Sequence, residues 1–418
     1  MQNTAEEKTG GFYAWYALAI LMVVYIFNFL DRQVIYILFG PIKTEMAFSD
    51  TQLALLGATS FAIFYTLLGI PFGRLADRRS RTRLIAVGLA VWSIFSGLTG
   101  FAGGFWTLFA CRVMVGVGEA TLGPAAISLL ADYFAPSRRA TVSSIYSMGI
   151  AIGAGLAALV GGALIQYGWR NAFFIVGFPG LLLAVLVFLM REPARTAPAA
   201  AVEPGENAGD WRGLIGNRSF LLLCLGYGFF GLATNNISVW GPTYFDRVFG
   251  IKPAVYGYWA GIVTMLAGIP ATLLGGIIAD WFRRRSGGGR MLYGALLSLV
   301  SIPCWLLVLF TDNFADHSTL VIGCGVVLLF AGLGWLGAAA ADATEIAGPS
   351  RRGLAVAIYF FTVNIAAYLI GANVIGKISD LLGSAQNPAV IKYALLVCPV
   401  CCLLGALCLW LGSRSLDK

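Results

Sequence analysis

Long apolar runs separated by short polar loops dominate the pattern of this 418-residue chain. Each run is long enough to cross the hydrocarbon core of a bilayer as a helix, which takes about 20 residues. The runs lack the two-residue alternation of strands, which excludes a closed barrel. One run contains a Gly-rich turn and therefore counts as parts of two helices, so the pattern predicts an all-α membrane protein with twelve membrane-spanning helices. The runs are Ala14–Phe39, Thr51–Gly73, Leu84–Cys111, Val113–Ala131, Thr141–Trp169, Asn171–Met190, Phe220–Phe245, Pro253–Ala279, Met291–Thr311, Ser318–Ala341, Leu354–Gly376 and Tyr393–Ser413.

Composition and charge agree with this class. Hydrophobic residues make up 59% of the chain and charged residues only 11%, less than half of the roughly 25% that soluble domains carry. Most of the 28 lysines and arginines fall in loops on one side of the expected topology. Because cytoplasmic loops carry the excess of basic residues, we expect both termini on the cytoplasmic side of a cell inner membrane. The net charge of +8 lies in these short loops, which argues against a nucleic-acid partner.

The longest polar segment divides the chain in two. It reads REPARTAPAAAVEPGENAGDWRGLIGNR and is rich in Pro, Ala and Gly, which is typical of a linker. We therefore expect a six-helix bundle over residues 1–190, a cytoplasmic linker over 191–217 and a second six-helix bundle over 218–418.

Two loop motifs occur once in each of these halves. The loop after the second helix reads GRLADRRSRTR from Gly73, and the loop after the eighth reads GIIADWFRRR from Gly276. Further along, APSRRATVSSIY at 135–146 matches GPSRRGLAVAIY at 348–359. Repeats of the same sense on one side of the membrane predict two halves related by an axis along the membrane normal.

The loop after the second helix resembles the signature loop of the major facilitator superfamily, although Ser80 stands where many members have glycine. Three further stretches, NFLDRQ at 28–33, CRVMVGVGEA at 111–120 and ADYFAPSRRA at 131–140, resemble the Spinster family of lipid transporters. Organic anion and cation symporters share an Asp-Arg pair in the first helix and a Gly-x-Gly-Glu in the fourth. The resemblance implies a secondary transporter that works by alternating access.

The same resemblance implies a gate at the basic loops. In the superfamily pattern, the acid that ends the second helix caps a neighbouring helix across the two halves and contacts arginines of the facing loop. The alternative is that these charges only set the topology. The candidate gating residues are Gly73, Asp77, Arg78, Arg81, Arg138, Arg139, Asp280, Arg351 and Arg352.

Four ionisable residues of the first half lie inside apolar runs or, for Arg112, between two adjoining ones: Asp31, Arg32, Arg112 and Glu119. A charge at that depth costs about 3 kcal/mol or more and needs a reason. At 1.5 Å per residue, Asp31 and Arg112 can lie level, with Glu119 roughly 10 Å deeper on the same face as Arg112. Arg32 points about 100° away from Asp31 and can reach a different partner.

These four groups allow two interpretations. A buried acid that loses its arginine when helices move takes up a proton, so the set predicts a proton-coupled cycle. In that cycle Asp31 and Glu119 are proton sites, and Arg32 and Arg112 are switching partners that also hold an anionic substrate, roles that the Spinster resemblance likewise implies. The alternative is a structural ion-pair network that joins the first and fourth helices.

The second half shows no comparable charges inside its apolar runs. Its candidate substrate-binding residues are amides and aromatics, for which the alternative is ordinary interhelical packing: Asn235, Asn236, Trp240, Tyr359 and Asn364. One charged wall and one largely apolar wall suit a small amphiphilic or anionic substrate. A proton-coupled symporter of small hydrophilic carboxylates is the alternative, followed by a passive facilitator.

Other function classes find little support. A membrane enzyme needs a clustered catalytic set, whereas the single histidine, His317, lies in an expected loop. The eight cysteines fall inside apolar runs, which argues against a disulfide framework. A non-transporting sensor would usually carry an added soluble domain, and no loop is long enough for one. We expect a monomer in the lipid bilayer without metal or cofactor.

Overall fold

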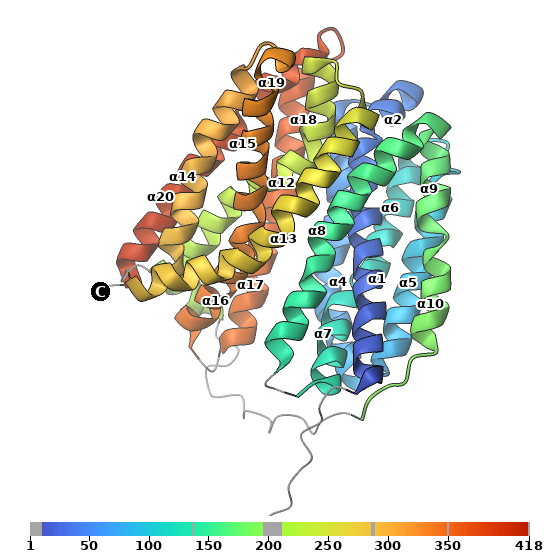
Figure 1. Cartoon of the computed structure of the whole chain (residues 1–418), viewed down its shortest axis with the longest axis vertical. Coiled ribbons are helices and arrows are strands. Elements are labelled where there is room, and N and C mark those ends of the chain that lie inside the picture. The colour runs from blue at the N-terminus through green and yellow to red at the C-terminus, as the bar shows by residue number, and fades with distance from the viewer. Residues whose placement is uncertain (1–10, 136–137, 195–210, 286–288, 349–350, 417–418) are drawn as a thin grey trace, which may run out of the picture.

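A computed structural model describes residues 11–135, 138–194, 211–285, 289–348 and 351–416. Within these residues the chain is helical and contains no strand. Twelve segments are long and apolar enough to cross a membrane, which confirms the expected number. Figure 1 shows them in two halves standing side by side, with the first half in blue to green and the second in yellow-green to red.

The first half contains six spans, some of them built from more than one helical segment. The segments are α1 (Phe12–Ile37), α2 (Phe39–Met46), α3 (Asp50–Ala54), η1 (Leu55–Thr59), α4 (Ser60–Arg78), α5 (Arg81–Thr99), α6 (Phe105–Glu119), α7 (Leu122–Tyr133), α8 (Arg139–Leu164), η3 (Ile165–Tyr167), α9 (Trp169–Gly177) and α10 (Gly180–Phe188).

The second half follows a short helix, α11 (Trp211–Gly216). Its segments are α12 (Arg218–Phe249), α13 (Pro253–Arg285), α14 (Gly289–Phe310), α15 (Phe314–Gly334), α16 (Leu336–Ala347), α17 (Arg352–Asn364), η5 (Ile365–Gly371), α18 (Ala372–Leu381), η6 (Pro388–Val390), α19 (Ile391–Ala394) and α20 (Val397–Leu416). Two of the short segments, η1 and η5, are π-helical, and the other two, η3 and η6, are 3₁₀ turns.

Spans four and ten are both interrupted near the middle of their sequence. The first break separates α6 from α7 after Glu119, and the second separates α15 from α16 at Trp335. In the first break the Thr121 hydroxyl donates a hydrogen bond of 2.8 Å to the carbonyl of Gly118. The same carbonyl also accepts the backbone N–H of Thr121 at 3.3 Å, so the interruption leaves it paired, as apolar surroundings require.

Glycines bring α6 into close contact with two neighbours. A Cβ built on Gly116 would lie 2.7 Å from the carbonyl oxygen of Phe61, and one built on Gly118 would lie 2.6 Å from that of Gly88. Small residues at such positions allow helix backbones to approach closely in a membrane. The Gly-x-Gly before Glu119 therefore packs span four against spans two and three and fixes where Glu119 lies.

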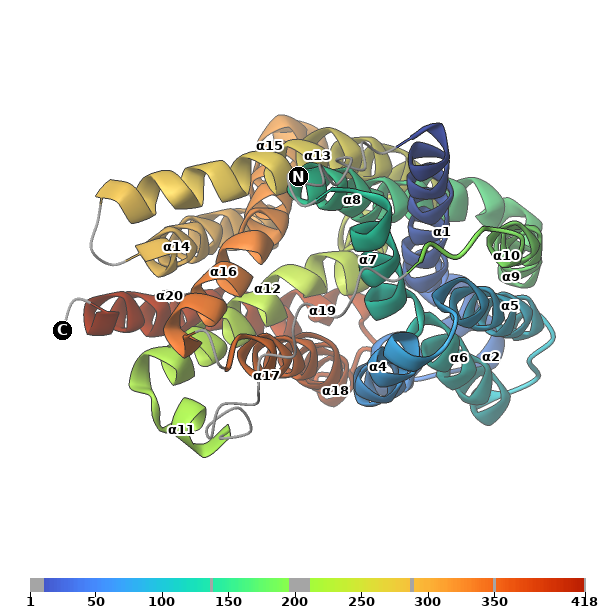
Figure 2. The ribbon, with the colours of Figure 1, turned by 90° about the horizontal axis from the view of Figure 1, so that it is seen from below.

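The two ends of the bundle differ. We call one the basic end, because it carries Arg78 to Arg81 and Arg283 to Arg285, and the other the closed end, because Asp50, Arg247 and Asp380 join the two halves there. In Figure 1 the basic end is at the bottom, where the ribbons of the halves diverge. Figure 2, seen from below, shows α7 and α8 of the first half facing α12 and α13 of the second.

Candidate functional site

An ion pair between two spans lies at the centre of the first half. Arg32 of α1 donates to one carboxylate oxygen of Glu119, at 2.8 Å from Nη2 and 3.2 Å from Nε. Nη2 also lies 3.4 Å from the side-chain oxygen of Asn28. Glu119 is fully buried at the end of α6, and its second oxygen has no partner among the described residues. Arg32 therefore pairs with Glu119, which lies 87 positions further along the chain, and not with its neighbour Asp31.

Aromatic rings surround the guanidinium of Arg32. Its central carbon lies 4.3 Å from the ring centroid of Phe61, 4.7 Å from that of Tyr65 and 4.8 Å from that of Phe29. Cation–π contacts of this kind are stronger where water is excluded. They hold the Arg32 charge in an apolar site without adding a second counter-ion.

Asp31 and Arg112 form a second, looser group. Ser96 of α5 donates a hydrogen bond to one carboxylate oxygen of Asp31, and the other oxygen has no partner among the described residues. Arg112 is 0% exposed, and none of its three guanidinium nitrogens has a hydrogen-bond partner there. Arg112 is close enough to Asp31 to interact with it electrostatically. A buried cation with five unused N–H groups is costly.

The candidate residues of the second half are mostly packed between helices in this structure. Trp240 is fully buried, donates to the carbonyl of Ala372 at 3.3 Å and lies against Phe39. The Asn236 amide donates to its own helix at the carbonyl of Leu232. Tyr359 is also fully buried. Asn235 and Asn364 are partly exposed, although the amide nitrogen of Asn235 is buried and has no partner among the described residues.

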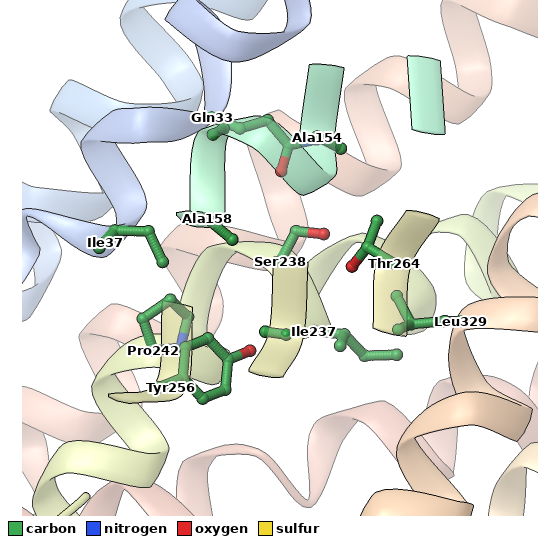
Figure 3. A pocket seen from close by; sticks show the side chains of 12 residues that line it. Gln33, Ile37, Ala154, Ala158, Ile237, Ser238, Pro242, Tyr256, Thr264 and Leu329 are labelled. Carbon is green, nitrogen blue, oxygen red and sulfur yellow. The ribbon is translucent and has the colours of Figure 1, made fainter. Parts of the chain in front are cut away.

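One small cavity lies where the halves meet (Figure 3). It has a volume of about 60 Å³ and is lined by α1, α8, α12, α13 and α15, with Gln33, Ser238, Tyr256 and Thr264 supplying its polar groups. This volume suits a few water molecules and is too small for an amphiphile. Gln33 lies two positions after Asp31, so the cavity reaches the level of the buried charges.

At the basic end, the charges with described partners pair within each half. Arg81 bonds to Asp132 and, at 2.8 Å, to Glu192, while Arg290 bonds to Asp280 at 2.7 Å and to Glu345 at 3.1 Å. The two clusters occupy equivalent places in the two halves, since each joins the start of the third or ninth span to the end of the fourth or tenth.

The other candidate gating residues make fewer described contacts. Arg139 lies 3.5 Å from the carbonyl of Phe134, Arg78 and Arg138 are exposed, and Gly73 faces Pro124. Arg351 is half-buried. The side chains of Asp77 and Arg352 lie outside the described part of the structure, and so does the expected cap across the halves at Asp77.

A polar cluster at the closed end escaped the sequence analysis. Asp50 is fully buried and accepts hydrogen bonds from Arg247 at 2.7 Å to each oxygen, and from Lys43 at 2.5 Å. Asp380 in turn accepts from the backbone N–H groups of Asp50 and Thr51 at 2.9 and 2.8 Å, and so caps the N-terminus of α3 from the other half. These contacts join the halves.

The expectation that the second half has no buried charge in its spans is wrong. Asp342 is 3% exposed, lies within the tenth span and bonds to Arg290 at 3.1 Å. It lies directly after the apolar run Ser318–Ala341 and so outside the predicted span. The helix continues to Ala347, which places the carboxylate among buried side chains.

A bundle of twelve spans in two halves, with buried charges beside their junction, is the architecture of a membrane transport protein. A family profile described as Major Facilitator Superfamily matches residues 21–367, and the chain belongs to this superfamily.

Individual relatives cover almost the whole chain. An MFS-type efflux pump of Mycolicibacterium smegmatis (strain ATCC 700084 / mc(2)155) is 30% identical over 97% of this chain and 94% of the pump. The sphingosine-1-phosphate transporter SPNS2 of Xenopus tropicalis is 27% identical over 94% of this chain and 80% of that protein.

The fold has a solved counterpart among Spinster proteins. The crystal structure of a bacterial homolog to human lysosomal transporter Spinster, in an inward-facing and unoccupied conformation, matches with a TM-score of 0.82. It is 27% identical to this chain, and the match covers 96% of this chain and 97% of that one. The resemblance inferred from the short motifs is thus confirmed at the level of the whole fold.

Proposed function

We propose that this protein is a proton-coupled transporter that moves an amphiphilic, lipid-like or anionic substrate by alternating access. The observation that carries the proposal is the unpartnered guanidinium of Arg112, fully buried and close to Asp31. Leaving a buried charge unpaired costs several kcal/mol, and an anionic headgroup that binds Arg112 would offset that cost.

The proposal assigns the basic end to the cytoplasm, because basic loops favour that side. The halves are joined by polar contacts at the closed end, so the structure then corresponds to an inward-facing state. The match to an inward-facing Spinster homolog supports this assignment. By the same rule, we propose that the protein lies in a cell inner membrane, with both termini and the linker between the halves on the cytoplasmic side.

Proton coupling would act through the two buried acids. With Glu119 ionised, its carboxylate holds the Arg32 guanidinium at 2.8 Å. A proton on Glu119 removes the charge that Arg32 faces, and the arginine then becomes free to move or to bind an anion. Asp31, with one oxygen bonded by Ser96 and the other unused, can take up the second charge change beside Arg112.

An amphiphile is the preferred substrate class for two reasons. The buried charges belong to the first half, while the candidate residues of the second half are aromatics and amides such as the buried Trp240 and the partly exposed Asn235. A related protein is a sphingosine-1-phosphate transporter by name, and such a molecule has an anionic head and an apolar tail. Arg112 also suits small carboxylates, which remain the alternative.

The test is reconstitution into liposomes that contain a pH-sensitive dye. Lysophospholipids, sphingoid lipids and small organic carboxylates are added in turn to the wild type, Asp31→Asn, Glu119→Gln and the control Glu45→Gln. Glu45 is an acid of the first half that pairs with Arg170 on the surface of the closed end. We expect an amphiphile to trigger proton flux in the wild type and the control, and not in Asp31→Asn or Glu119→Gln.

Each other result has a definite meaning. Flux triggered only by carboxylates would replace the substrate class by the alternative. Normal gradient-driven transport by both Asp31→Asn and Glu119→Gln would refute proton coupling and leave a passive facilitator. Thermal unfolding of each variant in detergent checks that loss of flux is not loss of fold.

A further inference from the structure

The second and eleventh spans meet through two π-helical segments. η1 interrupts the second span at Leu55–Thr59, η5 interrupts the eleventh at Ile365–Gly371, and the two segments are in contact. Figure 2 shows α4 of the first half beside α17 and α18 of the second. Single π-turns inside α-helices are rare and are frequent at functional sites. We call this contact the 2–11 seam, formed by Thr51, Thr59, Tyr368, Asn373 and Asp380.

Polar contacts follow this seam from the closed end inward. At the closed end, Asp380 accepts a hydrogen bond of 2.6 Å from the Thr51 hydroxyl. Farther along both spans, the Asn373 amide donates to the Thr59 hydroxyl at 2.5 Å. Both contacts join one half to the other. In a transporter that alternates between two states, such contacts have to break when the closed end opens.

Tyr368 is the next member of the seam. It lies in η5 of the second half and packs against the apolar cores of both halves. It packs on the first-half cluster that contains Phe61, whose ring centroid lies 4.3 Å from the central carbon of the Arg32 guanidinium, so Tyr368 lies close to the Arg32–Glu119 pair. A side chain of the second half thus reaches the ion pair of the first half, in line with the contacts that hold the closed end together.

We infer that Tyr368 is a positioning residue that couples the Arg32–Glu119 ion pair to closure of the 2–11 seam. The inference rests on the proposed function. A proton on Glu119 releases Arg32, which can then donate a hydrogen bond to the Tyr368 hydroxyl. It can do so only while the seam is closed, because the two groups belong to different halves. Conversely, the place of Arg32 depends on whether Glu119 holds it. The contact between Arg32 and Tyr368 therefore depends on the protonation state of Glu119 and exists in only one conformation. Coupling requires an interaction that differs between states in this way.

Other ionisable groups face the same place and could contribute to its response to pH. Four of them are tyrosines: Tyr25 and Tyr36 on α1, Tyr65 on α4 and Tyr146 on α8. The other two are the remaining buried charges of the first half, Asp31 and Arg112. The experiment therefore compares Tyr368 with Glu119 directly rather than relying on a pH profile alone.

The test uses Tyr368→Phe, which keeps the ring and removes the hydroxyl. The matched control is Tyr258→Phe, a tyrosine exposed on α13. Two rates are measured in liposomes: substrate exchange without a gradient, and accumulation driven by a pH gradient. We expect Tyr368→Phe to exchange substrate like the wild type and to lose gradient-driven accumulation about tenfold, the effect of one hydrogen bond to a charged group.

A second readout follows the seam itself. Gln33, in the cavity between the halves, is replaced by Cys and labelled with an impermeant maleimide from the closed-end side, with peptide-resolved mass spectrometry as the detector. Labelling should depend on pH in the wild-type background and in Tyr258→Phe, and lose that dependence in Tyr368→Phe. Tyr368→His keeps a ring with hydrogen-bonding capacity, so it should recover part of the pH dependence of labelling.

The outcomes separate this inference from the proposed function. If Glu119→Gln abolishes coupling while Tyr368→Phe behaves like the wild type in both readouts, the role of Tyr368 is refuted and the proposed function stands. If Glu119→Gln has no effect either, the proposed function has failed. Loss of exchange in a folded Tyr368→Phe would also overturn the inference, because a residue that only couples the two processes leaves exchange intact.

Discussion

Asp50→Asn should shift the protein away from the conformation described here. The carboxylate of Asp50 is completely buried and receives Arg247 through both guanidinium nitrogens at 2.7 Å, Lys43 at 2.5 Å and Ser379 at 2.7 Å. Arg247 and Ser379 belong to the second half. Asparagine keeps the shape and one acceptor oxygen, and it leaves two cations facing a neutral amide.

The size of the effect follows from burial. The side chains of Arg247 and Lys43 are 9% and 24% exposed, so neither regains full hydration when the acid is neutralised. Removing one partner of a buried ion pair costs about 3–5 kcal/mol. In a state with the closed end open, the same cations face water and lose little. The ratio of closed to open molecules should therefore fall by roughly two to four orders of magnitude.

Distance measurements by double electron–electron resonance can detect this shift. Spin labels are attached at Thr44→Cys on the first half and Lys252→Cys on the second, both exposed at the closed end. The partly exposed Cys111 and Cys408 are replaced by alanine to keep labelling specific. We expect a short distance to dominate in the parent protein and a longer one to dominate in Asp50→Asn.

Glu45→Gln is the control for this experiment. Its carboxylate accepts from Arg170 at 2.8 Å and from the Trp169 indole at 2.5 Å, at the same end but within the first half. The distance distribution should not change in this variant. If Asp50→Asn keeps the parent distribution while remaining folded, the buried charge of Asp50 is not what holds this end closed, and the reasoning is wrong.

Two further predictions concern stability. Burial raises the pKa of Glu192, but hydrogen bonds led by the Thr82 backbone N–H outweigh it and lower that pKa to about 2. Because a depressed pKa stabilises the fold only while the carboxylate is ionised, Glu192→Gln should lower the melting temperature by a constant amount from about pH 8 to 5, and the difference should narrow below about pH 4; an unchanging difference down to pH 2 would contradict this. Gly257→Ala should destabilise the protein by about 1–3 kcal/mol, since the added Cβ would lie 2.3 Å from the Ala158 carbonyl oxygen. Gly276→Ala on the same helix places its Cβ in open space and should not destabilise the protein. Equal melting temperatures for Gly257→Ala and Gly276→Ala would argue against tight packing of α8 on α13.

The spans were predictable because the bilayer imposes a length and an apolar composition on each of them. The two halves were predictable because the basic motifs recur at equivalent places. The close packing of span four could be suspected from its glycines, yet only the structure shows that Gly116 faces Phe61 and Gly118 faces Gly88. Likewise, depth along two helices suggested a common level for the buried charges, while helix rotation decides that Arg32 meets Glu119.

The closed end could not be predicted from one sequence. Asp50, Arg247 and Asp380 lie at the ends of apolar runs, where a charge is unremarkable and costs little on its own. Their contacts join positions 197 and 330 residues apart, and no local pattern encodes such a distance. Tyr368 gave even less signal, because it is one of 16 tyrosines in a chain where aromatics pack most helix contacts.

The two halves repeat the same architecture and differ in what they bury. Each has an arginine–acid cluster at the basic end, Arg81 with Asp132 in one and Arg290 with Glu345 in the other. The first half alone adds Asp31, Arg112 and the Arg32–Glu119 pair, and the second half adds Asp342 close to its own basic cluster. A change of charge near the junction therefore acts first on the first half. The change reaches the second half through side chains that cross the junction. Substitution of Arg247 at the closed end, or of Tyr368 beside the ion pair, should therefore separate substrate binding from the movement of the halves.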